Sequence, residues 1–500
     1  MYRRPNPKQL TFETFHLPFG GKLRSDNRWV LLAKQIPWQD VEQEYARQFS
    51  DEAIGSPAKS SRMAFGALIL KERLGVTDRE LGEQIAENPY LQHFLGLSTY
   101  QEDAPFHHSM LTHFRKRFSQ TSLAKINAAI AHRAVEAHHA GNEDAQEDVK
   151  DDPPSSKGKL IVDATCAPAD IKYPTDLNLL NEAREKTEAI IDHLHRFRTS
   201  PTKKPRTYRQ KARTAYLRVA MARKPGPKKI RQGVGKQLRY LRRNLGAISR
   251  MAEEGRLIHV TPHQYKNLLV ITELYRQQQW MYHTRSHRIA DRIVSISQPH
   301  VRPIVRGKAG CPVEFGAKVS VSLVEGISFV DRISWDAYNE SGDVVDQIET
   351  YHRRFGYYPA SVHADKIYRT RANRRYCTSK GIRLSGPPLG RPKKATEHNA
   401  EQVKQDKLLL RSDETDRIAI EGKFGQGKRR FGLARIMAKL AVTSEVMIMV
   451  SFLVMNLETI LSKVRYFWLY AWWRGWNIPL RITLAARAPT AHASLRYSAC

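Results

Sequence analysis

The stretch KLIVDAT, residues 159–165, decides the fold, because a short apolar run there meets a polar side chain at Asp163. Such a run predicts a buried β-strand. Four later runs of the same kind predict further strands, two of them joined as a hairpin, at residues 317–324, 327–334, 359–365 and 382–386. Amphipathic segments at residues 343–356 and 371–381 predict helices between them. The sequence therefore predicts an α/β domain with a mixed five-stranded sheet and flanking helices.

Composition shifts divide the rest of the chain. Gly75 ends one predicted N-terminal helix, and Thr77 with Glu80 forms the capping-box pattern that begins the next. We predict an all-α N-terminal domain at residues 1–140, followed by an acidic linker at 141–158. The α/β domain comes in two parts, 159–175 and 301–460, with a long helical insertion at 176–300 between them. A Trp-rich tail follows at 461–500.

Charge points to a polyanionic partner. The chain has 500 residues with 82 Lys and Arg against 50 Asp and Glu, a net charge of +32. Half of that excess lies between Pro201 and Arg256, a segment with 18 basic residues and only two acidic ones. A hydrophobic fraction of 41% excludes a wholly disordered chain. Because neutralising phosphates releases counterions, nucleic acid is the favoured partner class.

Two short regions are candidate DNA contacts. The predicted helix that ends in Arg115, Lys116 and Arg117 is typical of a helix-turn-helix reader, although a plain helical bundle with a basic end explains it equally well. The insertion offers a basic surface or, alternatively, only a solvated charged face. Its candidate phosphate-binding residues are Lys203, Lys204, Arg206, Lys228, Lys229, Arg242 and Arg243.

The chain carries signals of a reducing compartment and none of a membrane. Its four cysteines lack the paired spacing of a zinc site or a disulfide framework. The N-terminus has no apolar core of a signal peptide, and the apolar stretch from Leu440 to Leu457 contains Glu445 and several polar residues. We expect a buried helix at that stretch, no membrane contact and a cytoplasmic location.

Three carboxylates are candidates for metal-dependent chemistry on phosphodiesters. Asp163 and Asp365 each lie at the end of a short apolar strand, where a rigid backbone holds the oxygen and the following loop stays open. Glu421 lies on a predicted helix that places Arg417 and Lys428 on the same face. Carboxylates of this kind hold pairs of divalent ions in enzymes that cut nucleic acids. Turn or cap roles for the aspartates, and an intrahelical ion-pair stripe for the glutamate, are the simpler alternatives.

Long blocks of the chain resemble bacterial insertion-sequence transposases of the DDE type, from about residue 10 to residue 465. The matching blocks begin with FGALILKERLGVTDRELGEQIAENPYLQHFLGL and continue through IVDATCAPADIKYPTDLNLLNEAR, RPIVRGKAGCPVEFGAKVSVS, HADKIYRTRANRRYCTSKGIRLSGPPLGRP and RIAIEGKFGQGKRRFGLARI. The resemblance implies a ribonuclease-H-like catalytic domain. It also implies that Asp163, Asp365 and Glu421 hold two Mg²⁺ or Mn²⁺ ions, and that Arg417 and Lys428 contact DNA near the cleaved phosphate.

The implied partners are the inverted-repeat DNA of transposon ends and a target DNA, with a homodimer in the synaptic complex and a place near the bacterial nucleoid. One position departs from the family signature, which has a tyrosine where this chain has Glu414. Two further polar residues near the candidate ligands have other expected roles: Asp176 is expected to cap a helix, and His363 to pack or to hydrogen-bond. A non-catalytic DNA-binding relative and a nuclease that cuts without joining remain the alternative functions.

Overall fold

A computed structural model of the chain describes residues 15–18, 21–49, 57–140, 156–198, 203–305, 313–390 and 399–475. Most of the predicted acidic linker and the end of the Trp-rich tail lie outside the described residues.

The N-terminal part is helical, as the sequence predicts. Gly75 ends α3 with a left-handed φ of 68°, a conformation that glycine adopts without strain. The Thr77 side chain accepts a hydrogen bond from the Glu80 backbone and caps α4. The helices are α1 (Arg28–Gln35), α2 (Trp38–Ala46), α3 (Ser61–Leu74), α4 (Asp78–Glu87), α5 (Pro89–Phe94), α6 (Met110–Arg117) and α7 (Gln120–Ala140).

A mixed sheet follows, with six strands rather than the predicted five. The strands are β1 (Lys159–Pro168), β2 (Arg302–Val305), β3 (Val313–Val324), β4 (Ile327–Ser334), β5 (Ser361–Ala364) and β6 (Arg383–Leu384). The strand missing from the prediction is β2, a four-residue edge strand containing Pro303 that pairs with the start of β3. Its brevity and its proline hide it from pattern analysis.

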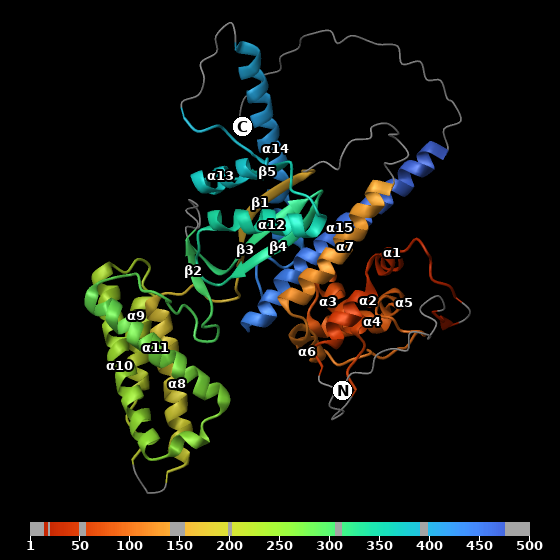
Figure 1. The fold of residues 1–500 in the computed structure, drawn as a ribbon. Coiled ribbons are helices and arrows are strands. Elements are labelled where there is room, and N and C mark those ends of the chain that lie inside the picture. The colour runs from red at the N-terminus through yellow and green to blue at the C-terminus, as the bar shows by residue number, and fades with distance from the viewer. Residues whose placement is uncertain are drawn as a thin grey trace, which may run out of the picture.

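Strand order places β1 in the middle of the sheet. The order is β2-β3-β1-β5-β6, and β4 also pairs with β3. β1 is antiparallel to β3 and parallel to β5, and the predicted β3–β4 hairpin turns at Glu325 and Gly326. Four helices flank the sheet: α12 (Asp343–Phe355), α13 (Arg371–Ser379), α14 (Ala400–Arg430) and α15 (Ala441–Gly475). Figure 1 shows the first part of α14 extending beyond the sheet.

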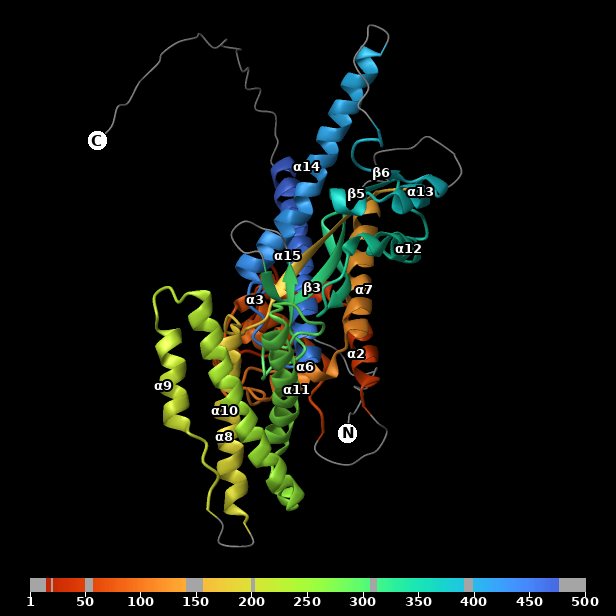
Figure 2. The ribbon, with the colours of Figure 1, turned by 90° about the vertical axis from the view of Figure 1, so that its left-hand side faces the viewer.

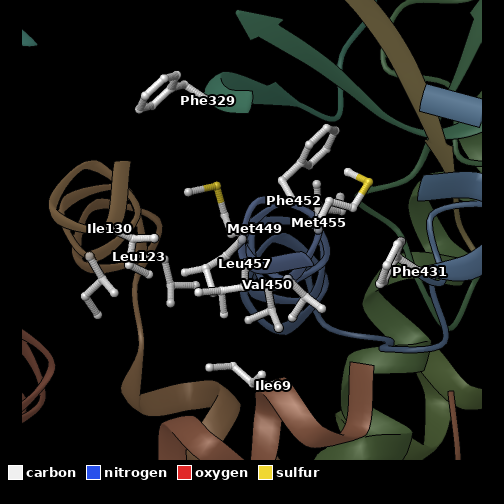
Figure 3. Packing of buried hydrophobic residues seen from close by; sticks show 14 of the residues in the cluster. Ile69, Leu123, Ile130, Phe329, Phe431, Met449, Val450, Phe452, Met455 and Leu457 are labelled. Carbon is white, nitrogen blue, oxygen red and sulfur yellow. The ribbon is translucent and has the colours of Figure 1, made fainter. Parts of the chain in front are cut away.

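Helix α15 joins the N-terminal helices to the sheet. Its residues Val450, Phe452 and Leu457 are almost fully buried, and Figure 3 shows them among side chains such as Ile69 of α3 and Phe329 of β4. Residues 441–464 are the one described segment whose length and composition would suit a membrane span, and 78% of its apolar window is buried within the protein. The prediction of a buried helix at this stretch is confirmed.

The insertion is a separate helical bundle with its own core. It contains α8 (Asp176–Arg196), α9 (Arg209–Ala220), α10 (Pro227–Glu253) and α11 (Pro262–Thr284). Leu180, Leu241 and Leu274 are fully buried between these helices. Figures 1 and 2 show the bundle extending away from the sheet. The prediction for Asp176 is wrong, because Thr175 caps α8 and Asp176 instead accepts hydrogen bonds from Gln278 and Arg292.

Candidate active site

Strand register brings Asp163 and Asp365 to neighbouring positions. Val162 of β1 pairs with Ala364 of β5, so each aspartate is the next residue along two parallel strands. Adjacent strands lie roughly 4.8 Å apart. The two acids, about 200 positions apart in sequence, therefore lie side by side at the end of β5.

Helix α14 brings Glu421 and Arg417 close to Asp365. Arg417 forms an ion pair of 2.8 Å with Asp365 and another of 3.1 Å with Glu421. The helix continues without a break to Arg430, despite the glycines at 422, 425 and 427. Lys428, seven residues after Glu421, therefore stays on the face that carries Glu421. One guanidinium thus joins the second aspartate to the glutamate.

Asp163 lies in a more buried and more acidic environment than its neighbours. The pKa of Asp163 is raised to about 6, mainly by burial and also by the negative charges of Glu340 and Asp365. A hydrogen bond from the Ala164 backbone and the positive charge of Arg417 act in the opposite direction. A carboxylate in such a place is stabilised by any cation that reaches it.

Glu340 is a fourth acidic residue near Asp163, and no sequence pattern pointed to it. It lies in a short 3₁₀ turn, η4 (Glu340–Gly342), and forms an ion pair with Lys318 of β3. Nearby Tyr368 is fully buried, and its hydroxyl has no hydrogen-bond partner among the described residues. No apolar period or motif spacing marks either residue, so only the folded chain reveals them.

The donor chemistry fits divalent metal ions. Asp163, Asp365 and Glu421 offer only carboxylate oxygens, the ligands that Mg²⁺ and Mn²⁺ prefer. In the described residues, the one set of three acidic, His or Cys side chains with ligand atoms all within 4.8 Å of one another is a different one, His363, Asp413 and Asp416. The three predicted ligands are therefore spaced more widely, with Arg417 between two of them.

The His363 cluster is already neutralised by neighbouring cations. Asp413 accepts two hydrogen bonds of 2.8 Å from Arg383, and Asp416 accepts one of 2.7 Å from Lys159. The buried His363 ring hydrogen-bonds Ser361 at 2.9 Å. These ion pairs join α14 to β1 and β6 directly before Arg417 in the helix, so the cluster positions the site.

Several predicted DNA-binding residues make contacts within the protein. Arg115 is buried against Asp78 at 2.6 Å, and Arg117 donates a hydrogen bond to Tyr45 at 2.8 Å. In the insertion, Lys204 pairs with Asp192. Two neighbouring arginines contact tyrosines, Arg242 by a hydrogen bond to Tyr275 and Arg243 by stacking on Tyr208. The other predicted contacts are exposed, at Lys116, Lys203, Arg206, Lys228 and Lys229.

Comparison with known proteins identifies the family. Residues 362–458 match the family model "Transposase DDE domain", and residues 18–117 match "Transposase domain (DUF772)". The first match includes Asp365 and Glu421. The chain is also 30% identical over 154 residues to the uncharacterized protein ORF8 in the nfe locus of Rhizobium meliloti, covering 31% of this chain and 68% of that protein. No solved structure matches significantly. The chain belongs to the DDE transposases of insertion sequences.

Proposed function

We propose that the protein is an active DNA transposase that cleaves DNA at transposon ends and joins them to a target. The observation that supports this proposal is that Asp163 and Asp365 follow paired positions of two parallel strands, while Arg417 joins Asp365 to Glu421 of α14. Two carboxylates that end neighbouring strands, with a third on a packed helix, also support a ribonuclease-H-like catalytic domain.

In this proposal the three carboxylates hold two Mg²⁺ or Mn²⁺ ions. The ions would supply Lewis acidity for the in-line displacement at phosphorus, first with water and then with the freed 3′ hydroxyl as nucleophile. Asp163 and Asp365 hold their oxygens in place because they extend from paired strands.

Cationic side chains bind the DNA. Arg417 leaves its carboxylates to contact a phosphate near the cleaved bond when metal ions take over their neutralisation, and Lys428 contacts the same strand further along α14. Exposed Lys116, Lys203 and Arg206 are proposed to contact duplex DNA elsewhere. Pairing of two inverted-repeat ends calls for a homodimer, acting in the cytoplasm at the bacterial nucleoid.

The test is an assay with a labelled transposon end, a plasmid target and Mg²⁺. We expect cut and joined products from the wild-type protein, and neither from Asp163→Ala, Asp365→Ala or Glu421→Ala, each of which still shifts the labelled end in a gel. Asp406→Ala, at an exposed acid earlier on α14, is the matched control. Cuts without joining would identify a nuclease, and a gel shift alone a non-catalytic binder; full strand transfer by any of the three variants would overturn the site assignment.

A further inference from the structure

We propose that a groove between α9 and α10 of the insertion is a second DNA-binding site, which holds the phosphate backbone of duplex DNA away from the catalytic carboxylates. This inference rests on the proposed function, since it assigns the DNA that the enzyme acts on to an additional surface. The groove has a volume of about 640 Å³.

Cations from both helices line the groove, and no acid of the described residues does. Its basic residues are Lys211 and Arg218 of α9 and Lys236, Arg239 and Arg243 of α10, with Tyr240 beside them. All five basic side chains are exposed. Five positive charges along one open groove create a potential that attracts a polyanion.

Within the described residues, four of the groove cations have no acidic partner, unlike several basic residues elsewhere in the insertion. Arg209 and Lys204 both pair with Asp192, and Arg292 pairs with Asp176. In the part of the chain that the structure describes, none of Lys211, Arg218, Lys236 and Arg239 has an acidic atom within ion-pair distance. Their charge is therefore available to a ligand, and four unneutralised cations so close together repel one another until an anion arrives.

Spacing along the helices suits a nucleic acid backbone. Lys211 and Arg218 lie seven residues apart on one face of α9, as Lys236 and Arg243 do on α10, and each interval spans about 10 Å at the helical rise. That length corresponds to about three phosphates of one DNA strand along the duplex axis. Lysine and arginine contacts to phosphates carry no base information, so we expect binding independent of sequence.

The rigid bundle supports this use of the surface. Ala212 and Val219 of α9 are buried against the neighbouring helices, and Gln237 of α10 donates a hydrogen bond to the Ala212 carbonyl. This contact fixes the two helices together, so the cations on their exposed faces keep their arrangement. A fixed row of charges binds a stiff duplex at lower entropic cost than a flexible basic tail does.

The experiment compares two quadruple variants in the full chain by fluorescence anisotropy with a 40-base-pair duplex of random sequence. The groove variant is Lys211→Gln, Arg218→Gln, Lys236→Gln and Arg239→Gln. The control removes the same charge from exposed positions of the insertion outside the groove, by Arg213→Gln, Arg223→Gln, Lys224→Gln and Lys266→Gln. Thermal melting checks that both variants fold like the wild type.

We expect the groove variant to lose at least about tenfold in affinity at 0.1 M salt and about three to four from the slope of log K against log salt concentration. The control should lose much less of both. Equal losses in the two variants, or an unchanged groove variant, would overturn the groove assignment and leave the proposed function standing. A wild-type protein that binds no DNA would overturn the proposed function itself. A matched transposon-end duplex, run in parallel, shows whether the groove holds the end or any DNA.

Discussion

Arg417 lies 2.8 Å from Asp365, although the two residues are separated by a helix, a strand and 52 positions of sequence. The same side chain reaches Glu421 one helical turn further on. The two contacts show that α14 is packed with its charged face toward the end of β5. One guanidinium therefore neutralises charge on two of the three proposed ligands.

We therefore expect Arg417→Gln to raise the affinity of the protein for Mn²⁺ by about fivefold or more, because a competing positive charge beside the ligands is removed. The same variant should lose most of its cleavage of transposon ends, since the proposed phosphate contact is gone. Isothermal titration calorimetry with Mn²⁺ measures the first effect, and Arg411→Gln on the exposed side of α14 is the control. Unchanged Mn²⁺ affinity would mean that Arg417 does not compete for these carboxylates.

The pair formed by Asp413 and Arg383 fastens α14 to the sheet. Asp413 is 4% exposed, and its two oxygens each accept a hydrogen bond of 2.8 Å from the guanidinium. Asp413→Asn removes a bidentate, partly buried ion pair, so we expect a loss of about 2 kcal/mol in the free energy of unfolding. Urea titration measures it against Asp406→Asn; equal stability of the two variants would show that the pair does not hold the helix.

Two glycines of α14 differ in their surroundings, so we expect their substitution by alanine to change the stability of the protein in opposite directions. A Cβ at Gly422 would meet nothing within 4 Å, so Gly422→Ala should stabilise the protein by up to about 1 kcal/mol through helix propensity. A Cβ at Gly427 would lie 2.5 Å from Leu433 Cδ1, so Gly427→Ala should destabilise it by about 1–3 kcal/mol. Thermal melting ranks the two variants, and the reverse order would contradict the packing of α14 on α15.

The buried carboxyl group of Glu72 should make the stability of the folded protein depend on pH. It is buried between α3 and α15, where desolvation raises the pKa of Glu72 to about 7 against a hydrogen bond from Ser451. The native state therefore keeps a proton that the unfolded chain releases above about pH 4.5. The stability contributed by this proton is full below that pH and is lost as the pH rises through about 7.

Glu72→Gln stays neutral at every pH, so the variant should gain about 3 kcal/mol over the wild type at pH 8 and little at pH 4.5. Chemical denaturation at both pH values measures the difference, with the exposed Glu83→Gln as control. A gain that is the same at both pH values would show that the carboxyl group does not titrate in this window.

Local patterns in the sequence predicted those parts of the fold that depend on local chemistry. The apolar run before Asp163, the Gly326 turn and the Gly75 helix end each follow from a few neighbouring residues, and each is confirmed. Helix α14 is less easily predicted, because glycines at 422, 425 and 427 are unfavourable in a helix interior. The helix is continuous to Arg430, and a side chain at Gly427 would not fit against Leu433 and against Met455 of α15.

Contacts between distant residues could not be predicted in this way. The approach of Glu340 to Asp163, the pairing of Asp413 with Arg383 and the edge strand at Arg302–Val305 all depend on which surfaces meet after folding. Arg115 shows the same limit. Its position at a basic helix end suggested a contact with DNA, but in the structure it forms an ion pair with Asp78. A run of basic residues in the sequence shows that positive charge is present. Only the packed structure shows which of these charges are exposed and free of an acidic partner.

The most direct test of the account is anomalous X-ray diffraction from crystals of the protein with transposon-end DNA and Mn²⁺. The account predicts anomalous peaks bound by Asp163, Asp365 and Glu421, with Arg417 turned away from Asp365 toward a phosphate. A peak at His363, Asp413 and Asp416 with none at the three predicted ligands would contradict it.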